Sequence, residues 1–120
     1  MSIATTAKET DRDAGLAALE ELLREVGDHL RRIERSLSDE IRDYPTPIPR
    51  CDAQFNHLFE QRSRLHRALE RIDAGAARPV TRAGQLELLE EFAASAAYVE
   101  DPAEDEIRAR VRGELSRLGR

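Results

Sequence analysis

Hydrophobic residues in the first third of the chain recur at alternating spacings of three and four positions. This spacing places them along one side of a helix and is the heptad pattern of coiled coils. It predicts a long helix from about Asp13 to Asp43, preceded by a polar segment over residues 1–12 that we expect to be flexible. The heptad positions are Leu16, Leu19, Leu23, Val26, Leu30, Ile33 and Leu37.

A second heptad stretch predicts another helix from about Asp52 to Asp73. A Pro-rich connector over residues 44–50 separates the two stretches, and each proline favours an extended conformation for the residue before it. We therefore expect a stiff crossover between helices, with a polyproline ligand for a partner as the alternative. Gly75 and Pro79 predict the end of the second helix. The second seam consists of Phe55, Leu58, Arg62, Leu65, Leu69 and Ile72.

Folding the chain back at the connector brings the two seams into phase, which predicts a long antiparallel, coiled-coil-like hairpin over residues 13–73. The expected pairs across the seam are Leu37 with Leu58, Leu30 with Leu65, Val26 with Leu69, and Leu23 with Ile72.

A shorter helix pair is expected over residues 82–118. Thr81 is a candidate N-cap for a helix from about Arg82 to Tyr98. Asp101, Pro102 and Glu104 form a capping-box start for the last helix, which Gly119 should end. The predicted fold class is all-α and bundle-like, with residues 13–120 forming a single helical domain.

Composition and charge narrow the functional classes. The 120 residues are 40% hydrophobic, 36% charged and only 4% aromatic, which is typical of long helices. A net charge of −5 argues against nucleic-acid binding, although the arginine-rich last helix leaves an anionic partner as an alternative. Cys51 is the one cysteine, and no apolar run has the ~20 residues of a membrane span. These features favour a cytoplasmic protein with no membrane association.

One polar group in the second helix is a candidate site. His57, Glu60 and Arg64 are three and four positions apart and therefore share one broad helical face, with Arg62 close by. A histidine, a carboxylate and two cations could provide general acid–base chemistry on an anionic ligand. The alternative is a solvated face with a Glu60–Arg64 pair. The histidine spacings fit no metal site, and we expect no cofactor.

Arg62 interrupts the apolar seam and should face Ile33, with Glu34 as the nearest acidic partner. A buried polar residue of this kind can set the register and oligomeric state of a coiled coil. The other hypothesis is that Arg62 is held ready for an acidic ligand or partner residue.

Three hydrophobic residues, Leu22, Ile41 and Phe59, lie off the predicted seam and need another surface to cover them. We therefore expect a protein–protein interaction module, either a small homo-oligomeric adaptor or an accessory subunit of a larger assembly. Its partner would be a second copy, a larger protein, or both. The alternative is a small helical enzyme or ligand-binding protein with its site around His57, Glu60 and Arg62.

Overall fold

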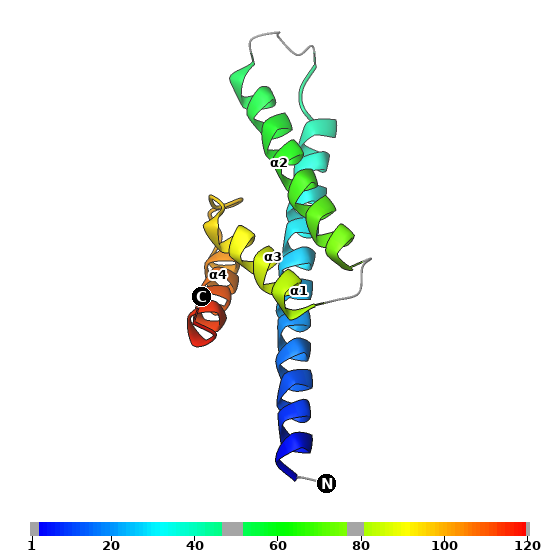
Figure 1. Cartoon of the computed structure of the whole chain (residues 1–120). Helices are drawn as coiled ribbons and strands as arrows, with labels where there is room; N and C mark the ends of the chain where they lie inside the picture. The colour runs from blue at the N-terminus through cyan, green and yellow to red at the C-terminus, as the bar shows by residue number, and fades with distance from the viewer. Residues whose placement is uncertain (1–2, 47–51, 77–80, 120) are drawn as a thin grey trace.

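The computed structural model describes residues 3–46, 52–76 and 81–119, with side chains from residue 15 onward except residue 16. These residues form four helices and no strand, which confirms the predicted all-α fold. Helices α1 and α2 pack most closely as a long hairpin, and the shorter pair α3 and α4 lies against the middle of α1 (Figure 1). The molecule is elongated, with principal extents of 73 × 27 × 18 Å. The helices are α1 (Ile3–Arg42), α2 (Ala53–Ala76), α3 (Arg82–Ala94) and α4 (Pro102–Arg117).

Helix α1 begins at Ile3, well before the expected start near Asp13. The intervening residues contain neither proline nor glycine, so nothing in this stretch opposes helix propagation. As a result the N-terminal part of α1 extends past α3 along the axis of the molecule (Figure 1).

The start of α2 is fixed by Asp52. Its carboxylate accepts a hydrogen bond from the Phe55 N–H (2.9 Å) and another from the Tyr44 hydroxyl (2.7 Å). The bond from Phe55, together with that from Tyr44, lowers the pKa of Asp52. This cap links the end of α1 to the start of α2 across the connector. Positions 47–50 of the predicted Pro-rich connector lie outside the described residues.

The end of α2 differs from the prediction. The helix continues through Gly75 to Ala76, so the expected stop at Asp73–Gly75 is wrong. A Cβ atom at Gly75 would lie 2.8 Å from the Leu88 side chain of α3. Glycine at this position therefore allows α2 and α3 to approach each other closely.

The boundaries of the shorter pair confirm the two predicted N-caps. Thr81 accepts a hydrogen bond from the Gly84 N–H at 3.0 Å, and Asp101 accepts one from the Ala103 N–H at 2.8 Å. Gly119 has a φ of +76°, which agrees with the predicted end of α4. Helix α3, however, ends at Ala94 and does not reach the expected Tyr98, because Ser95 adopts an extended conformation.

The core forms where all four helices meet. It confirms the heptad positions Leu19, Val26, Leu30, Ile33, Leu65 and Leu69 as buried, and it also includes Leu22, which the sequence left without a covering surface. The rest of the cluster comes from α3, α4 and their connection, namely Leu86, Leu89, Phe92, Tyr98, Ile107, Val111 and Leu115.

Two ion pairs between α1 and α2 report on the register of the hairpin. Glu34 pairs with His66 (3.4 Å), and Arg31 pairs with Asp73 (2.7 Å). In the expected register Glu34 would lie opposite Gln61, more than one helical turn from His66. Both pairs depart from that register in the same direction, toward the C-terminal end of α2. The apolar seam is therefore confirmed, whereas the expected pairings across it are displaced.

Candidate functional site

The polar group predicted on α2 does not converge into a site. His57 and Glu60 are both exposed, and among the described residues no hydrogen bond or ion pair joins them. Arg64 turns toward the α3–α4 connection and donates to the carbonyl oxygens of Ala96 and Ala97, the latter at 3.3 Å. The expected Glu60–Arg64 pair is therefore wrong. Arg64 holds the connection in place.

Arg62 also has a different environment from the expected one. Glu34, its predicted partner, pairs with His66 instead. The Arg62 guanidinium lies over the Phe59 ring, 4.9 Å from the ring centroid, and within the described part of the chain it has no carboxylate partner. The side chain is half-buried, which is common for an arginine because its long apolar stem can cover hydrophobic surface while its charge stays in water.

The most concentrated polar chemistry is a buried network that joins α1 to α4. His29 projects from α1, and Glu104 and Arg108 project from successive turns of α4, with exposed fractions of 4%, 1% and 5%. One Glu104 carboxylate oxygen lies 2.9 Å from His29 Nε2. The other accepts hydrogen bonds from the Tyr98 backbone N–H at 2.9 Å and from Arg108 Nε at 3.1 Å. We refer to His29, Glu104 and Arg108 as the buried triad.

The protonation state of the triad follows from these contacts. Burial alone would raise the pKa of Glu104, but the hydrogen bonds from His29, Tyr98 and Arg108 outweigh it and lower the pKa below its usual value. Glu104 is therefore a carboxylate at neutral pH. Because a carboxylate only accepts hydrogen bonds, His29 Nε2 must carry the proton between them.

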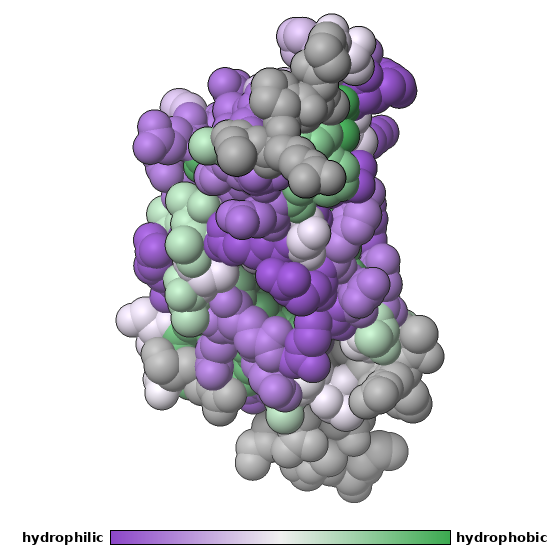
Figure 2. All heavy atoms as spheres, turned by 90° about the horizontal axis from the view of Figure 1, so that it is seen from above, coloured by the Kyte–Doolittle hydropathy of each residue, from purple (hydrophilic) through white to green (hydrophobic). Residues whose placement is uncertain are grey.

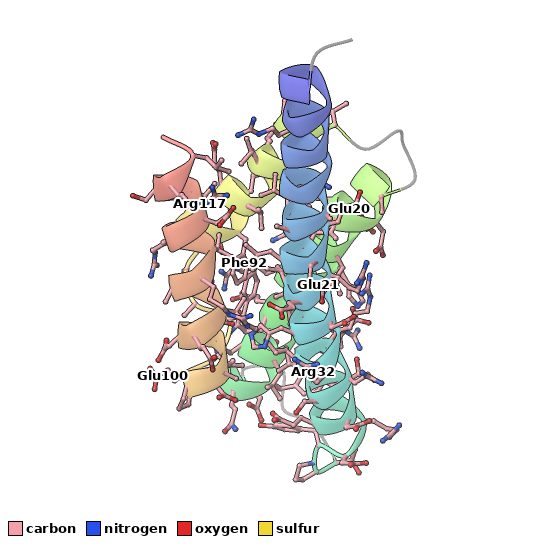
Figure 3. The ribbon with its side chains drawn as sticks, turned by 90° about the horizontal axis from the view of Figure 1, so that it is seen from below. Glu20, Glu21, Arg32, Phe92, Glu100 and Arg117 are labelled. Carbon is pink, nitrogen blue, oxygen red and sulfur yellow. The ribbon has the colours of Figure 1, made fainter. Side chains whose placement is uncertain are left out.

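Arg108 connects the triad to the α3–α4 connection. Its guanidinium donates to the carbonyl oxygens of Phe92, Ser95 and Ala96 at distances between 2.9 and 3.1 Å. Ser95 and Ala96 lie beyond the end of α3. The Phe92 carbonyl, in the last turn of α3, also accepts hydrogen bonds from the Ser95 N–H at 3.1 Å and from the Ser95 hydroxyl at 2.6 Å. The Phe92 ring lies below the guanidinium at 4.4 Å from its centroid, between α4 and α1 (Figure 3). Arg108 thus supplies donors to carbonyl oxygens in the last turn of α3 and in the segment that follows it.

Sequence reasoning missed the triad because each member had a more common explanation. Glu104 matched a capping box, Arg108 belonged to an arginine-rich helix, and His29 fitted no metal spacing. A signal was present nevertheless. All three residues occupy apolar-face positions of their helices, next to buried neighbours such as Leu30 and Ile107.

A triad buried on every side has no access for a substrate, so its chemistry is structural. The triad provides hydrogen-bond partners for the polar groups buried where α4, α1 and the α3–α4 connection meet. It thereby fixes the orientation of these three elements relative to one another.

A cavity of about 620 Å³ lies between α1, the end of α2 and the start of α3. Glu20, on the side of α1 near the end of α2, is at its rim (Figure 3). Its walls include apolar side chains from all three helices. Gln85, one of the lining residues, is 3% exposed, and neither its amide nitrogen nor its amide oxygen has a hydrogen-bond partner.

Two further observations on the described residues concern metal binding and membrane-spanning helices. They contain no group of three or more His, Cys, Asp or Glu side chains placed to hold a metal ion. None of their helices has the length and apolar character needed to cross a membrane. The chain matches no protein family, no curated protein and no solved structure.

Replacing His57 with alanine should leave the free energy of unfolding within about 0.5 kcal/mol of the parent, because the side chain is exposed and forms no network. Urea denaturation followed by circular dichroism measures this directly. A loss of 2 kcal/mol or more would show that His57 has a structural role that its exposed position does not account for.

Proposed function

We propose that this chain is a protein–protein interaction module that associates with a second copy of itself through the connector end of the α1–α2 hairpin. The observation that carries the proposal is that α3 and α4 cover only the middle of α1, so this end of the hairpin stands clear of them (Figure 1). A two-helix hairpin has only a narrow seam and is usually stabilised by a further packed surface.

An aromatic cluster lies on this uncovered end. Tyr44 packs edge-on against Phe55 with ring centroids 5.0 Å apart, and Phe55 packs against Phe59 at 4.9 Å. Phe59 is 38% exposed and is the one large hydrophobic side chain exposed among the described residues. We call Tyr44, Phe55, Phe59 and Arg62 the aromatic patch. Aromatic and arginine side chains are the types enriched where interfaces derive most of their binding energy.

The charges around the patch favour a second copy over a strongly charged partner. Residues 31–43, which form the last turns of α1 and the residue after it, contain four arginines and four carboxylates, so this segment has no net charge. Viewed from this end, the surface mixes hydrophilic side chains with smaller hydrophobic areas (Figure 2). Two such surfaces meet without net repulsion, and two hairpins packed side by side form a four-helix arrangement.

The proposed alternative site at His57, Glu60 and Arg62 receives no support from the geometry, because these side chains do not converge. An accessory role in a larger assembly uses the same aromatic patch and differs only in the partner. The oligomeric state of the isolated chain distinguishes these two forms of the proposal.

Sedimentation equilibrium of the full chain at micromolar concentrations should show a dimer or higher oligomer. Replacing Phe59 with glutamate should weaken this association at least tenfold, because it places a charge at the centre of a desolvated contact. Replacing Ala109 with glutamate on the exposed face of α4 adds the same charge far from the patch and should leave the association unchanged.

A stable monomer at these concentrations would overturn self-association. An oligomer that withstands Phe59→Glu while circular dichroism shows an intact fold would place the interface elsewhere. If Ala109→Glu also dissociates the oligomer, the effect is one of overall charge and the patch has no specific role.

A further inference from the structure

A second, smaller cavity lies between α2 and α3, and none of the four residues of the aromatic patch lines it. Its volume is about 230 Å³. Because a water molecule takes up about 30 Å³ in the liquid, this cavity has room for a single ring with one small substituent. Half-buried apolar side chains form part of its wall, namely Ala68 and Ile72 of α2 and Leu88 of α3.

Three arginines of α2 also line this cavity. Arg64, Arg67 and Arg71 are three and four positions apart, so they share one face of the helix. The Arg64 guanidinium lies over the Tyr98 ring, 3.9 Å from its centroid, where the α3–α4 connection closes the cavity. Like charges at these helical spacings repel one another. The α2 side of the cavity is therefore cationic, in a chain whose net charge is −5.

Within the described residues, carboxylates neutralise only one of these three charges. Arg71 pairs with Glu91, which also lines the cavity, and with Glu87 at 3.8 Å. Arg64 donates to backbone carbonyl oxygens, which carry no net charge. Arg67 is exposed and forms no hydrogen bond or ion pair with any described residue. Two positive charges, one helical turn apart, are therefore left without a counter-charge at this cavity.

We propose that this cavity binds a small monocarboxylate with an apolar body, and that Arg67 pairs with its carboxylate. A guanidinium presents a planar pair of N–H donors that matches the two oxygens of a carboxylate. The charge of Arg64 adds to the attraction and would repel a cationic ligand. The apolar body lies against Ala68, Ile72 and Leu88, a wall that a fully hydrophilic anion would leave in contact with water. The bound anion also relieves the repulsion between the arginines.

The test uses benzoate together with benzamide, which has the same ring and a similar planar shape but no charge. In ¹H–¹⁵N spectra of the full chain, benzoate should produce saturable shifts of the backbone signals of Ala68 and Leu88. Benzamide should bind at least tenfold more weakly, because it cannot form a charge-assisted pair with Arg67.

A matched pair of variants isolates the role of Arg67. Arg67→Gln removes one charge at an exposed position and should weaken benzoate binding at least tenfold. Arg112→Gln removes the same charge from an exposed position of α4, where the arginine also lacks an ion pair with any described residue. This control should bind benzoate as the parent chain does. Circular dichroism checks that both variants keep the fold.

Three outcomes would overturn the proposal. The absence of a saturable shift with benzoate would show that the cavity is not an anion site. Equal binding of benzoate and benzamide to the parent chain would exclude recognition of the charge, and this comparison needs no variant. Benzoate binding that Arg67→Gln leaves unchanged, or that Arg112→Gln weakens equally, would show that Arg67 has no specific role.

Discussion

Replacing Glu104 with alanine should lower the free energy of unfolding by about 3–5 kcal/mol, which is the usual cost of removing one partner from a buried ion pair. The carboxylate is 1% exposed and holds three groups together, namely His29, the Tyr98 N–H and Arg108. Without it, all three donors would stay buried without their acceptor. Urea denaturation followed by circular dichroism measures the change.

Two controls separate the charge of Glu104 from its size and from its helix. Glu104→Gln keeps the shape and one acceptor oxygen, so it should cost less than alanine while still losing the charge. Glu106→Ala, on an exposed turn of the same helix, should change the free energy of unfolding by no more than about 0.5 kcal/mol. Equal effects of Glu104→Ala and Glu106→Ala would show that the triad contributes nothing specific.

Glu104 should also make the free energy of unfolding depend on pH in the acidic range. The pKa of Glu104 in the folded state is lowered from its ordinary value of 4.5, so the folded state binds this proton less readily than the unfolded state does. The corresponding stabilisation is present above pH 4.5 and is lost as the pH falls toward the folded-state pKa. In Glu104→Gln the free energy of unfolding should depend less steeply on pH in this range.

The sequence predicted those parts of the fold that depend on local rules. Heptad spacing identified the buried side of the hairpin, and the Thr81 and Asp101 caps placed the starts of α3 and α4. These features depend on residues close together in the chain. The hairpin register was harder to predict. Because apolar positions recur along both helices, sliding one helix past the other by a turn or more again places apolar side chains opposite each other.

The candidate site depended on contacts between distant elements, and there the predictions failed. Arg64 was expected to pair within α2 but holds the carbonyls of Ala96 and Ala97. Glu104 was expected to cap its own helix but binds His29, 75 positions away. Glu104 and Arg108 are charged residues on an apolar helix face that have buried partners, whereas Arg62 in the apolar seam lies over the Phe59 ring instead. Which of these outcomes applies emerges only when the helices are packed together.

Replacing Arg108 with methionine should destabilise the protein by about 3–5 kcal/mol, because it removes the cationic partner of a buried carboxylate. The carbonyls of Phe92, Ser95 and Ala96 would each lose one donor as well, while Phe92 would keep those of Ser95 and Ala96 would keep Arg64. Arg110→Met, which removes an exposed ion pair with Glu25, should cost no more than about 1 kcal/mol. Chemical denaturation of both variants gives the comparison.

The decisive measurement combines Arg108→Met with Glu104→Gln in a double-mutant cycle. If the two side chains act as one network, the double variant should be more stable than the sum of the single losses predicts, by at least about 1 kcal/mol. The reason is that the second substitution removes a group whose partner is already gone. Additive losses would contradict the network. Arg108 would then stabilise the α3–α4 connection through its carbonyl contacts alone. Glu104 would act independently of it, through His29 and Tyr98.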